Sequence, residues 1–265
     1  MDYDKNSMVL WWPKIKGLGI PVPKTTIIRM PRAFLKQASI EKYMPLIKKT
    51  AKQLGYPLFI RTDLASGKHS WEKSCYVPNP KVLLDHMLEV ISFNECADLV
   101  GLLWQAIVLR EFIELDWKFT TFTGKMPVAK ERRYFVKDGT VQCHHPYWLQ
   151  DAIEQHLKFC RDFDRWAKKA DAKRTRTREE IPEHWKRMLA GLNKETPHEI
   201  KLLTGYAEKV AKAMDGEYWS VDFAHAKNGV WYLIDMGTGE NSFHHPDCSY
   251  CPEPMQIKFT KNGPK

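Results

Sequence analysis

Short apolar runs alternate with longer stretches of helical character in the first half of the chain. Residues 31–54 start at a proline and stop before Gly55, as helices do, and Pro45 is expected to divide this helix in two. Residues 80–99 repeat apolar side chains at helical spacing. Apolar runs of strand length lie at residues 26–28, 56–61 and 106–109.

The second half is predicted to hold more strands and a long polar helical stretch. Strands are expected at residues 118–122, 132–136, 218–224 and 230–234. The last two of these strands are joined by a turn at residues 227–229, which predicts a hairpin. Residues 148–191 have the character of an inserted helical subdomain or lid, and residues 197–214 that of a further helix.

Composition narrows the class of protein. The chain has 265 residues, 43% of them hydrophobic, which is enough to bury a core. No apolar run reaches the length of a membrane span and the first residues lack a secretory signal, so we expect a cytoplasmic protein without a membrane partner. The six cysteines are scattered apart from one CxxC pair, which favours reduced thiols.

Charge adds a preference for anionic ligands. The net charge is +9, and much of the excess lies in residues 168–178. A basic balance suits a nucleotide, but it suits nucleic acid as well. With Trp166 and Trp185 nearby, this basic stretch could bind nucleic acid by charge and stacking, form a solvated helical face, or meet an acidic macromolecular acceptor.

The final hairpin carries two aspartates at strand positions. Asp222 lies within Ser-Val-Asp-Phe-Ala, and Asp235 ends Trp-Tyr-Leu-Ile-Asp. Such positions can face one another on one side of a hairpin, where two carboxylates repel unless a proton or a cation lies between them. Mg²⁺ with phosphate oxygens is the usual solution. The alternative is that two strand-end aspartates simply face water.

Arg61 ends a strand of buried character and is followed by a polar loop. Ser66, Gly67 and Lys68 in this loop could wrap a polyphosphate with backbone N–H groups, a hydroxyl and an ammonium group. The spacing differs from that of a P-loop. An ordinary hairpin loop would explain the same residues.

Two further segments are candidates for the same cleft. Glu111, Phe112 and Ile113 could present backbone groups and an apolar face to adenine, or form a plain strand end. In the run Glu-Arg-Arg-Tyr-Phe, strand alternation allows one of the two arginines to point into a cleft, and Arg133 shares its face with Glu131. Its guanidinium suits phosphate recognition, although both arginines could instead be solvated.

Taken in this order, these motifs resemble the ATP-grasp family. The resemblance rests on Gly-Ile-Pro-Val-Pro-Lys-Thr, Leu-Gly-Tyr-Pro-Leu-Phe-Ile-Arg, Arg-Glu-Phe-Ile, Glu-Arg-Arg-Tyr-Phe-Val-Lys-Asp-Gly, Val-Asp-Phe and Leu-Ile-Asp, and on the thirteen-residue step between the two aspartates. It covers residues 14–147 and 197–243. It looks closest to a divergent branch of phages and bacteria, related to a eukaryotic cell-division-cycle ATP-grasp protein that assists assembly of a translation initiation factor.

The resemblance implies an α+β ATP-grasp fold, with two lobes whose antiparallel sheets sandwich ATP. Residues 1–104 would form the N-terminal region and first lobe, and residues 105–265 the second lobe, with a basic helical insertion at about 148–194. The implied ATP contacts are Arg61 in place of a phosphate-binding lysine, the loop Ser66, Gly67 and Lys68, the adenine hinge Glu111, Phe112 and Ile113, and Arg133 at the terminal phosphate.

The same resemblance implies that Asp222 and Asp235 hold Mg²⁺. A third ligand common in the family, an asparagine two residues after the second acid, is Gly237 here, so Asn241 or Glu240 would substitute for it. The expected activity is an ATP- and Mg²⁺-dependent ligase that joins a small-molecule, peptide or protein carboxylate to an amine through an acyl phosphate, with Arg61, Lys68 and Arg133 supplying positive charge. Alternatives are an ATP-binding assembly factor for a protein partner, a nucleotide-dependent phosphotransferase, and a nucleic-acid-binding protein.

One further cluster stands near the C-terminal end of the sequence. His244, His245, Cys248 and Cys251 offer four nitrogen and sulfur ligands of the kind that bind zinc, and Cys143-His144-His145 offers more. Alternatively the histidines line the cleft, with His144 near the acceptor substrate, and the cysteines pack as thiols.

Overall fold

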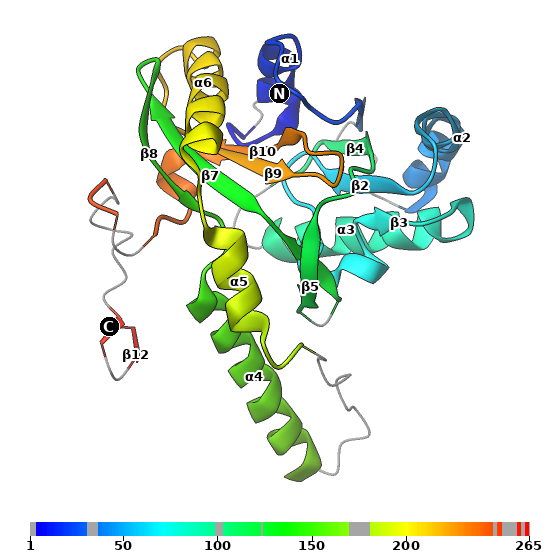
Figure 1. Cartoon of the computed structure of the whole chain (residues 1–265). Coiled ribbons are helices and arrows are strands. Elements are labelled where there is room, and N and C mark those ends of the chain that lie inside the picture. The colour runs from blue at the N-terminus through cyan, green and yellow to red at the C-terminus, as the bar shows by residue number, and fades with distance from the viewer. Residues whose placement is uncertain are drawn as a thin grey trace.

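The computed structural model describes residues 4–30, 37–98, 103–122, 124–169, 181–245 and 248–250, and the backbone of residues 259–260 and 263–264. Two antiparallel four-stranded sheets form its frame (Figure 1). The first sheet has the order β1 (Thr25–Arg29), β4 (Ala106–Glu111), β2 (Leu58–Thr62) and β3 (Tyr76–Val77). The second has the order β10 (Trp231–Thr238), β9 (Trp219–His225), β7 (Glu131–Lys137) and β8 (Thr140–Pro146).

Smaller elements complete the described chain. Two short ribbons are formed by β5 (Trp117–Thr121) with β6 (Met126–Ala129), and by β11 (Phe259–Thr260) with β12 (Gly263–Pro264). The helices are α1 (Met8–Ile15), α2 (Gln37–Leu54), α3 (Leu83–Asp98), α4 (Gln150–Lys169), α5 (Trp185–Asn193) and α6 (Pro197–Ala213), and the 3-10 turns are η2 (Lys68–Lys73), η3 (Pro80–Val82) and η4 (Gly239–Asn241). None of these described helices is both long and apolar enough to cross a membrane.

Three apolar cores hold these elements together. One packs α2 and α3 against the first sheet, a second packs α1 and α6 against the second sheet, and a third joins β5, β6, α4 and α5. The first two cores occupy one face of each sheet, which leaves the other face free for polar side chains. Helices α4 and α5 project away from the sheets (Figure 1) and lie inside the stretch predicted as an insertion.

The prediction that Pro45 divides the first long helix is wrong, because α2 continues through it. Ile40, Met44, Ile47 and Ala51 lie on one buried face that spans the proline, so packing against the first sheet outweighs the lost backbone hydrogen bond. Residues 31–36, where this helix was expected to begin, lie outside the described residues. The hydrophobic pattern also did not predict α1, β6 or β8.

The turn between β7 and β8 follows directly from its residues. Asp138 and Gly139 both have positive φ, at 49° and 77°, which matches the backbone twist of a tight hairpin. Strand β4 pairs with both β1 and β2, so residues 106–111 extend the first sheet. The division of the chain into two lobes stays a prediction, and we propose to place its boundary after Glu111.

Candidate functional site

A row of charged side chains crosses β10, β9 and β7. Asp235 lies directly opposite Asp222, which lies directly opposite Arg133. Opposed residues of an antiparallel sheet point to the same face, so all three side chains share one face. The alignment of the two acids depends on a bulge between Leu233 and Asp235. Without that extra residue, Asp235 would shift by one position and point to the other face.

Each of these two acids is bound by an arginine. Arg133 donates two hydrogen bonds to Asp222, from Nε to Oδ1 and from Nη2 to Oδ2, each 2.7 Å long. Arg61 on β2 donates from Nη1 to Oδ1 of Asp235 over 2.7 Å and so connects the two sheets. Burial alone would raise the pKa of Asp235, but the charge and hydrogen bond of Arg61 lower it. Both carboxylates therefore have a cationic partner within the protein.

A second network lies beside this row. Lys68 donates from Nζ to the Tyr147 hydroxyl over 2.8 Å, and its Nζ lies 4.4 Å from the centre of that ring. Burial would lower the pKa of Lys68, but Tyr147 and the charge of Glu131 outweigh it and leave the pKa raised. Lys68 is therefore a fixed positive charge at any pH of interest.

Glu131 is the buried acid of this network. It is 4% exposed and accepts a hydrogen bond from Nε1 of Trp148 over 3.1 Å. Burial raises the pKa of Glu131 to about 7, although the charge of Lys68 opposes the shift. The sequence pattern did not assign Glu131 to the site, although it placed the residue on the same face as Arg133.

Arg110 on β4 is another residue that the sequence pattern did not assign. It is 3% exposed, and it donates from Nη1 to the carbonyl of Ile234 over 2.5 Å. Burial and the nearby charge of Arg61 lower the pKa of Arg110 to about 10. Its buried Nη2 contacts no hydrogen-bond acceptor among the described residues. This donor is suited to an acceptor on a ligand, because a buried polar group without a partner is costly.

Two adjoining cavities meet at these charged residues. The first, of about 780 Å³, has the size of a typical small-molecule site and a largely aromatic and apolar wall. Its lining includes Phe59, Trp71, Phe112, Ile113, Leu115, Met126, Ser66, Lys68, Arg110, Glu111 and Glu131. The second, of about 1010 Å³, is lined by Asn6, Leu64, Arg133, Ser220, Met236, Gly237, Asn241 and Ser242. Arg61, Asp222 and Asp235 line both cavities and form the junction between them.

Most of the predicted site residues lie on these walls. Gly67 lines neither cavity, but it adopts a left-handed φ of 61° beside them, and a Cβ there would approach Cγ of Phe93 to 3.3 Å. Glu111 is anchored by the backbone N–H of Lys24 over 2.8 Å. Phe112 packs edge-on against Tyr76, with ring centres 5.1 Å apart. The structure thus brings together the predicted residues, while their roles stay predictions.

The oxygen donors at the junction fit a hard divalent cation. Asp222 and Asp235 offer carboxylates on one face of the sheet, and Asn241 lines the adjacent cavity with its amide bonded to Thr238. Mg²⁺ takes oxygen ligands of this type and keeps part of its water shell. The alternative ligand Glu240 is exposed and does not line either described cavity.

Two alternative interpretations change with the structure. His144 stacks on Tyr134 and contacts Glu195 on the face of the second sheet opposite to Arg133, so it does not line the cleft. Trp185 is 6% exposed within the third core, which removes it from any stacking surface, whereas Trp166 is 60% exposed. Residues 170–180, which carry much of the basic charge, lie outside the described residues.

Comparison with known proteins adds a family. The model of a family of ATP-grasp domains, the third family of its clade, matches residues 44–179, just over half of the chain. No curated protein matches this chain.

Among solved structures, C-terminally truncated Cdc123 from Schizosaccharomyces pombe aligns with a TM-score of 0.52 at 14% identity, over 88% of this chain and 83% of that one. D-alanine–D-alanine ligase from Bacillus anthracis complexed with ATP aligns with a TM-score of 0.42 at 14% identity, over 88% and 54%. N5-carboxyaminoimidazole ribonucleotide synthetase from Thermotoga maritima aligns with a TM-score of 0.43 at 10% identity, over 88% and 41%. The chain thus spans about half the length of these two ligases. The likeness to Cdc123 confirms the expected α+β ATP-grasp fold with antiparallel sheets.

Proposed function

Because this chain belongs to a family of ATP-grasp domains, we propose that it is an ATP- and Mg²⁺-dependent ligase that joins a carboxylate to an amine. The observation that carries the proposal is the charged junction of Arg61, Asp222 and Asp235, shared by two cavities. In this proposal the apolar cavity takes the nucleoside, the junction takes the phosphates, and the polar cavity takes the carboxylate. The ATP-grasp family typically uses ATP and Mg²⁺, which supports this division.

The charges of the cavities explain why a metal would accompany the nucleotide. Four cationic side chains and four acids line the two described cavities together: Arg61, Lys68, Arg110 and Arg133, and Glu111, Glu131, Asp222 and Asp235. This balance leaves no surplus of positive charge for a triphosphate. Mg²⁺ held by Asp222, Asp235 and Asn241 would offset the added negative charge and stabilise the charge that develops on the transferred phosphoryl group.

The proposed reaction proceeds in two displacements. A carboxylate oxygen forms a bond to the terminal phosphorus of ATP while the bond from that phosphorus to the bridging oxygen breaks, and ADP leaves. The amine nitrogen then bonds to the acyl carbon, phosphate leaves with its oxygen, and the nitrogen loses a proton to water. Arg61, Lys68 and Arg133 bind and orient the phosphates, so no covalent protein nucleophile is required.

A thermal unfolding experiment tests the nucleotide site. We expect Mg-ATP to raise the unfolding midpoint, since a ligand at a hundredfold excess over its dissociation constant stabilises the folded state by about 2.7 kcal/mol. The rise should shrink in Asp222→Asn and persist in the control Asp162→Asn, an exposed acid of α4 that contacts Arg165. A wild-type midpoint that no nucleotide moves would contradict ATP binding. ADP release stimulated by a carboxylate and an amine would then support ligation.

A second candidate function is an ATP-binding assembly factor that acts on a protein partner without ligation. Gly237 favours it, because this position in the second cavity offers no side-chain oxygen to a metal. Nucleotide-dependent binding of a partner, with no ADP release under any substrate pair, would favour this candidate over the ligase.

A further inference from the structure

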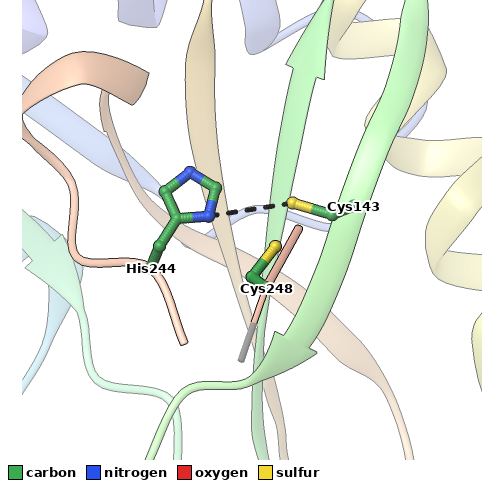
Figure 2. Close-up of side chains that lie close together, drawn as sticks. All are labelled: Cys143, His244 and Cys248. Carbon is green, nitrogen blue, oxygen red and sulfur yellow. Dashed lines mark hydrogen bonds between the residues drawn. The ribbon is translucent and has the colours of Figure 1, made fainter. Parts of the chain in front are cut away.

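Two thiols and an imidazole converge at the edge of the second sheet. Cys143 lies on β8 opposite Phe135, His244 follows η4, and Cys248 lies in a short turn beyond it. Their ligand atoms all lie within 4.8 Å of one another, and Sγ of Cys143 is 3.9 Å from Nδ1 of His244 (Figure 2). In a tetrahedral zinc site with metal–ligand bonds of about 2.0–2.3 Å, neighbouring ligand atoms are about 3.5 Å apart. The observed cluster needs only a small closure to reach that spacing.

The imidazole of His244 is held in a ligand orientation. Its Nε2 lies 2.7 Å from the hydroxyl of Tyr218, and its ring stacks on Phe135 with centres 3.5 Å apart. An N–H at Nε2 that donates to Tyr218 leaves the lone pair of Nδ1 directed at Cys143. Ligating histidines commonly have such an outer partner, which fixes the tautomer and the ring.

We propose that Cys143, His244 and Cys248 bind a zinc ion through Sγ, Nδ1 and Sγ. Both thiols would bind as thiolates and release their protons to solvent, so the two negative charges balance Zn²⁺. The fourth coordination position is left to water or a further side chain. The sequence alone suggested His244, His245, Cys248 and Cys251. The structure instead adds Cys143, places the ring of His245 outside the group, and leaves Cys251 outside the described residues.

Such a site would fix one wall of the second cavity. Phe243, next to His244, accepts a hydrogen bond from Nη1 of Arg133 at its carbonyl, and Asn241 and Ser242 line the cavity. Tying His244 to β8 therefore fixes the segment that carries Asn241. The inference does not depend on the proposed ligase activity, because the cluster lies apart from the junction residues.

Cobalt titration of the whole chain tests the proposal without a variant. We expect metal-depleted, reduced protein to bind about one Co²⁺ per chain, with thiolate-to-cobalt charge-transfer bands and the visible bands of tetrahedral cobalt, both removed by Zn²⁺. A Co²⁺ spectrum without charge-transfer bands would overturn the proposal. So would a Cys143–Cys248 disulfide that persists in protein purified under reducing conditions.

Variants then assign the ligands. We expect Cys143→Ser and Cys248→Ser to lose the charge-transfer bands, and Tyr218→Phe to weaken metal binding by about 10- to 100-fold through loss of the outer partner. Cys96→Ser, at an exposed cysteine of α3, should bind as the wild type does. Unfolding midpoints are compared in chelator, where the wild type also lacks metal, so equal midpoints show that a variant lost the site and kept the fold. Unchanged metal binding in both cysteine variants would overturn the assignment.

Discussion

The two faces of β7 use the same residue type for different purposes. Arg133 points to the front face and binds the carboxylate of Asp222 at the wall of a cavity. Arg132 points to the back, is 0% exposed, and donates to the carbonyls of Leu192 and Lys194 beside Glu195. Arg132 is fully buried and Arg133 half-buried, and both are paired. Yet Arg133 is reachable by a ligand, whereas Arg132 joins β7 to the connection between α5 and α6.

The difference teaches that burial of a charge does not by itself mark a functional site. What distinguishes the front face is its neighbours. Glu131 and Arg133 line cavities, whereas the back face carries Tyr134 and Val136 into the second apolar core. A charge on the front face can exchange its protein partner for a ligand, whereas a charge on the back face has no ligand to turn to.

The largest effect is expected from breaking the back face. Arg132→Met should destabilise the protein by about 3 kcal/mol, because Glu195 and two carbonyls lose a buried donor. Urea unfolding measures it. The control Arg187→Met, at an exposed residue of α5, should stay within about 0.5 kcal/mol of the wild type. Equal stabilities of the two variants would show that Arg132 does not clamp α5 to the sheet.

The next effect concerns the front face and activity. Arg133→Lys keeps the charge but loses the two-pronged geometry, so we expect turnover by the proposed ligase to fall about 100-fold with little loss of stability. Steady-state ADP release and thermal unfolding measure the two quantities. Arg132→Lys should show the opposite pattern, with lower stability and a retained nucleotide-induced shift. Full activity of Arg133→Lys would remove the contrast between the faces.

A pH-dependent effect isolates Glu131. Its pKa is raised to about 7 in the folded state by burial, so its stabilising contribution is complete below the ordinary glutamate pKa and is lost as the pH rises through about 7. Glu131→Gln should therefore gain about 2 kcal/mol relative to the wild type between pH 5 and pH 8. Urea unfolding at both pH values measures this. The exposed Glu41→Gln serves as control, and a parallel response of the two variants would contradict the burial of a carboxyl group.

The smallest effect sharpens the same point. Trp148→Phe removes the N–H that donates to Glu131 and should cost about 1 kcal/mol, with a larger loss at pH 8, where the acceptor is the carboxylate. Trp185→Phe is the matched control, since that indole lies in the same core and contacts no acid among the described residues. A Trp148→Phe loss that does not change with pH would attribute it to packing alone.

Local pattern was sufficient for many elements because their information is short-ranged. Apolar runs predicted β2 and β4, and strand alternation predicted that Arg132 and Arg133 point in opposite directions. The pattern could not predict that α2 continues through Pro45, because that outcome depends on a sheet assembled from distant strands. Strands β6 and β8 were missed because they carry less apolar alternation than their partners.

The candidate site shows the same division between near and distant information. The sequence by itself determined the motifs, their order, the family and most of the residues that line the cavities, because each motif has its chemistry within a few positions. The tertiary structure alone decided that a bulge aligns Asp235 with Asp222, that Arg110 and Glu131 are buried, and that Cys143 meets His244 from a distant part of the chain. Burial and register depend on which surfaces pack together, and that is a property of the folded chain as a whole.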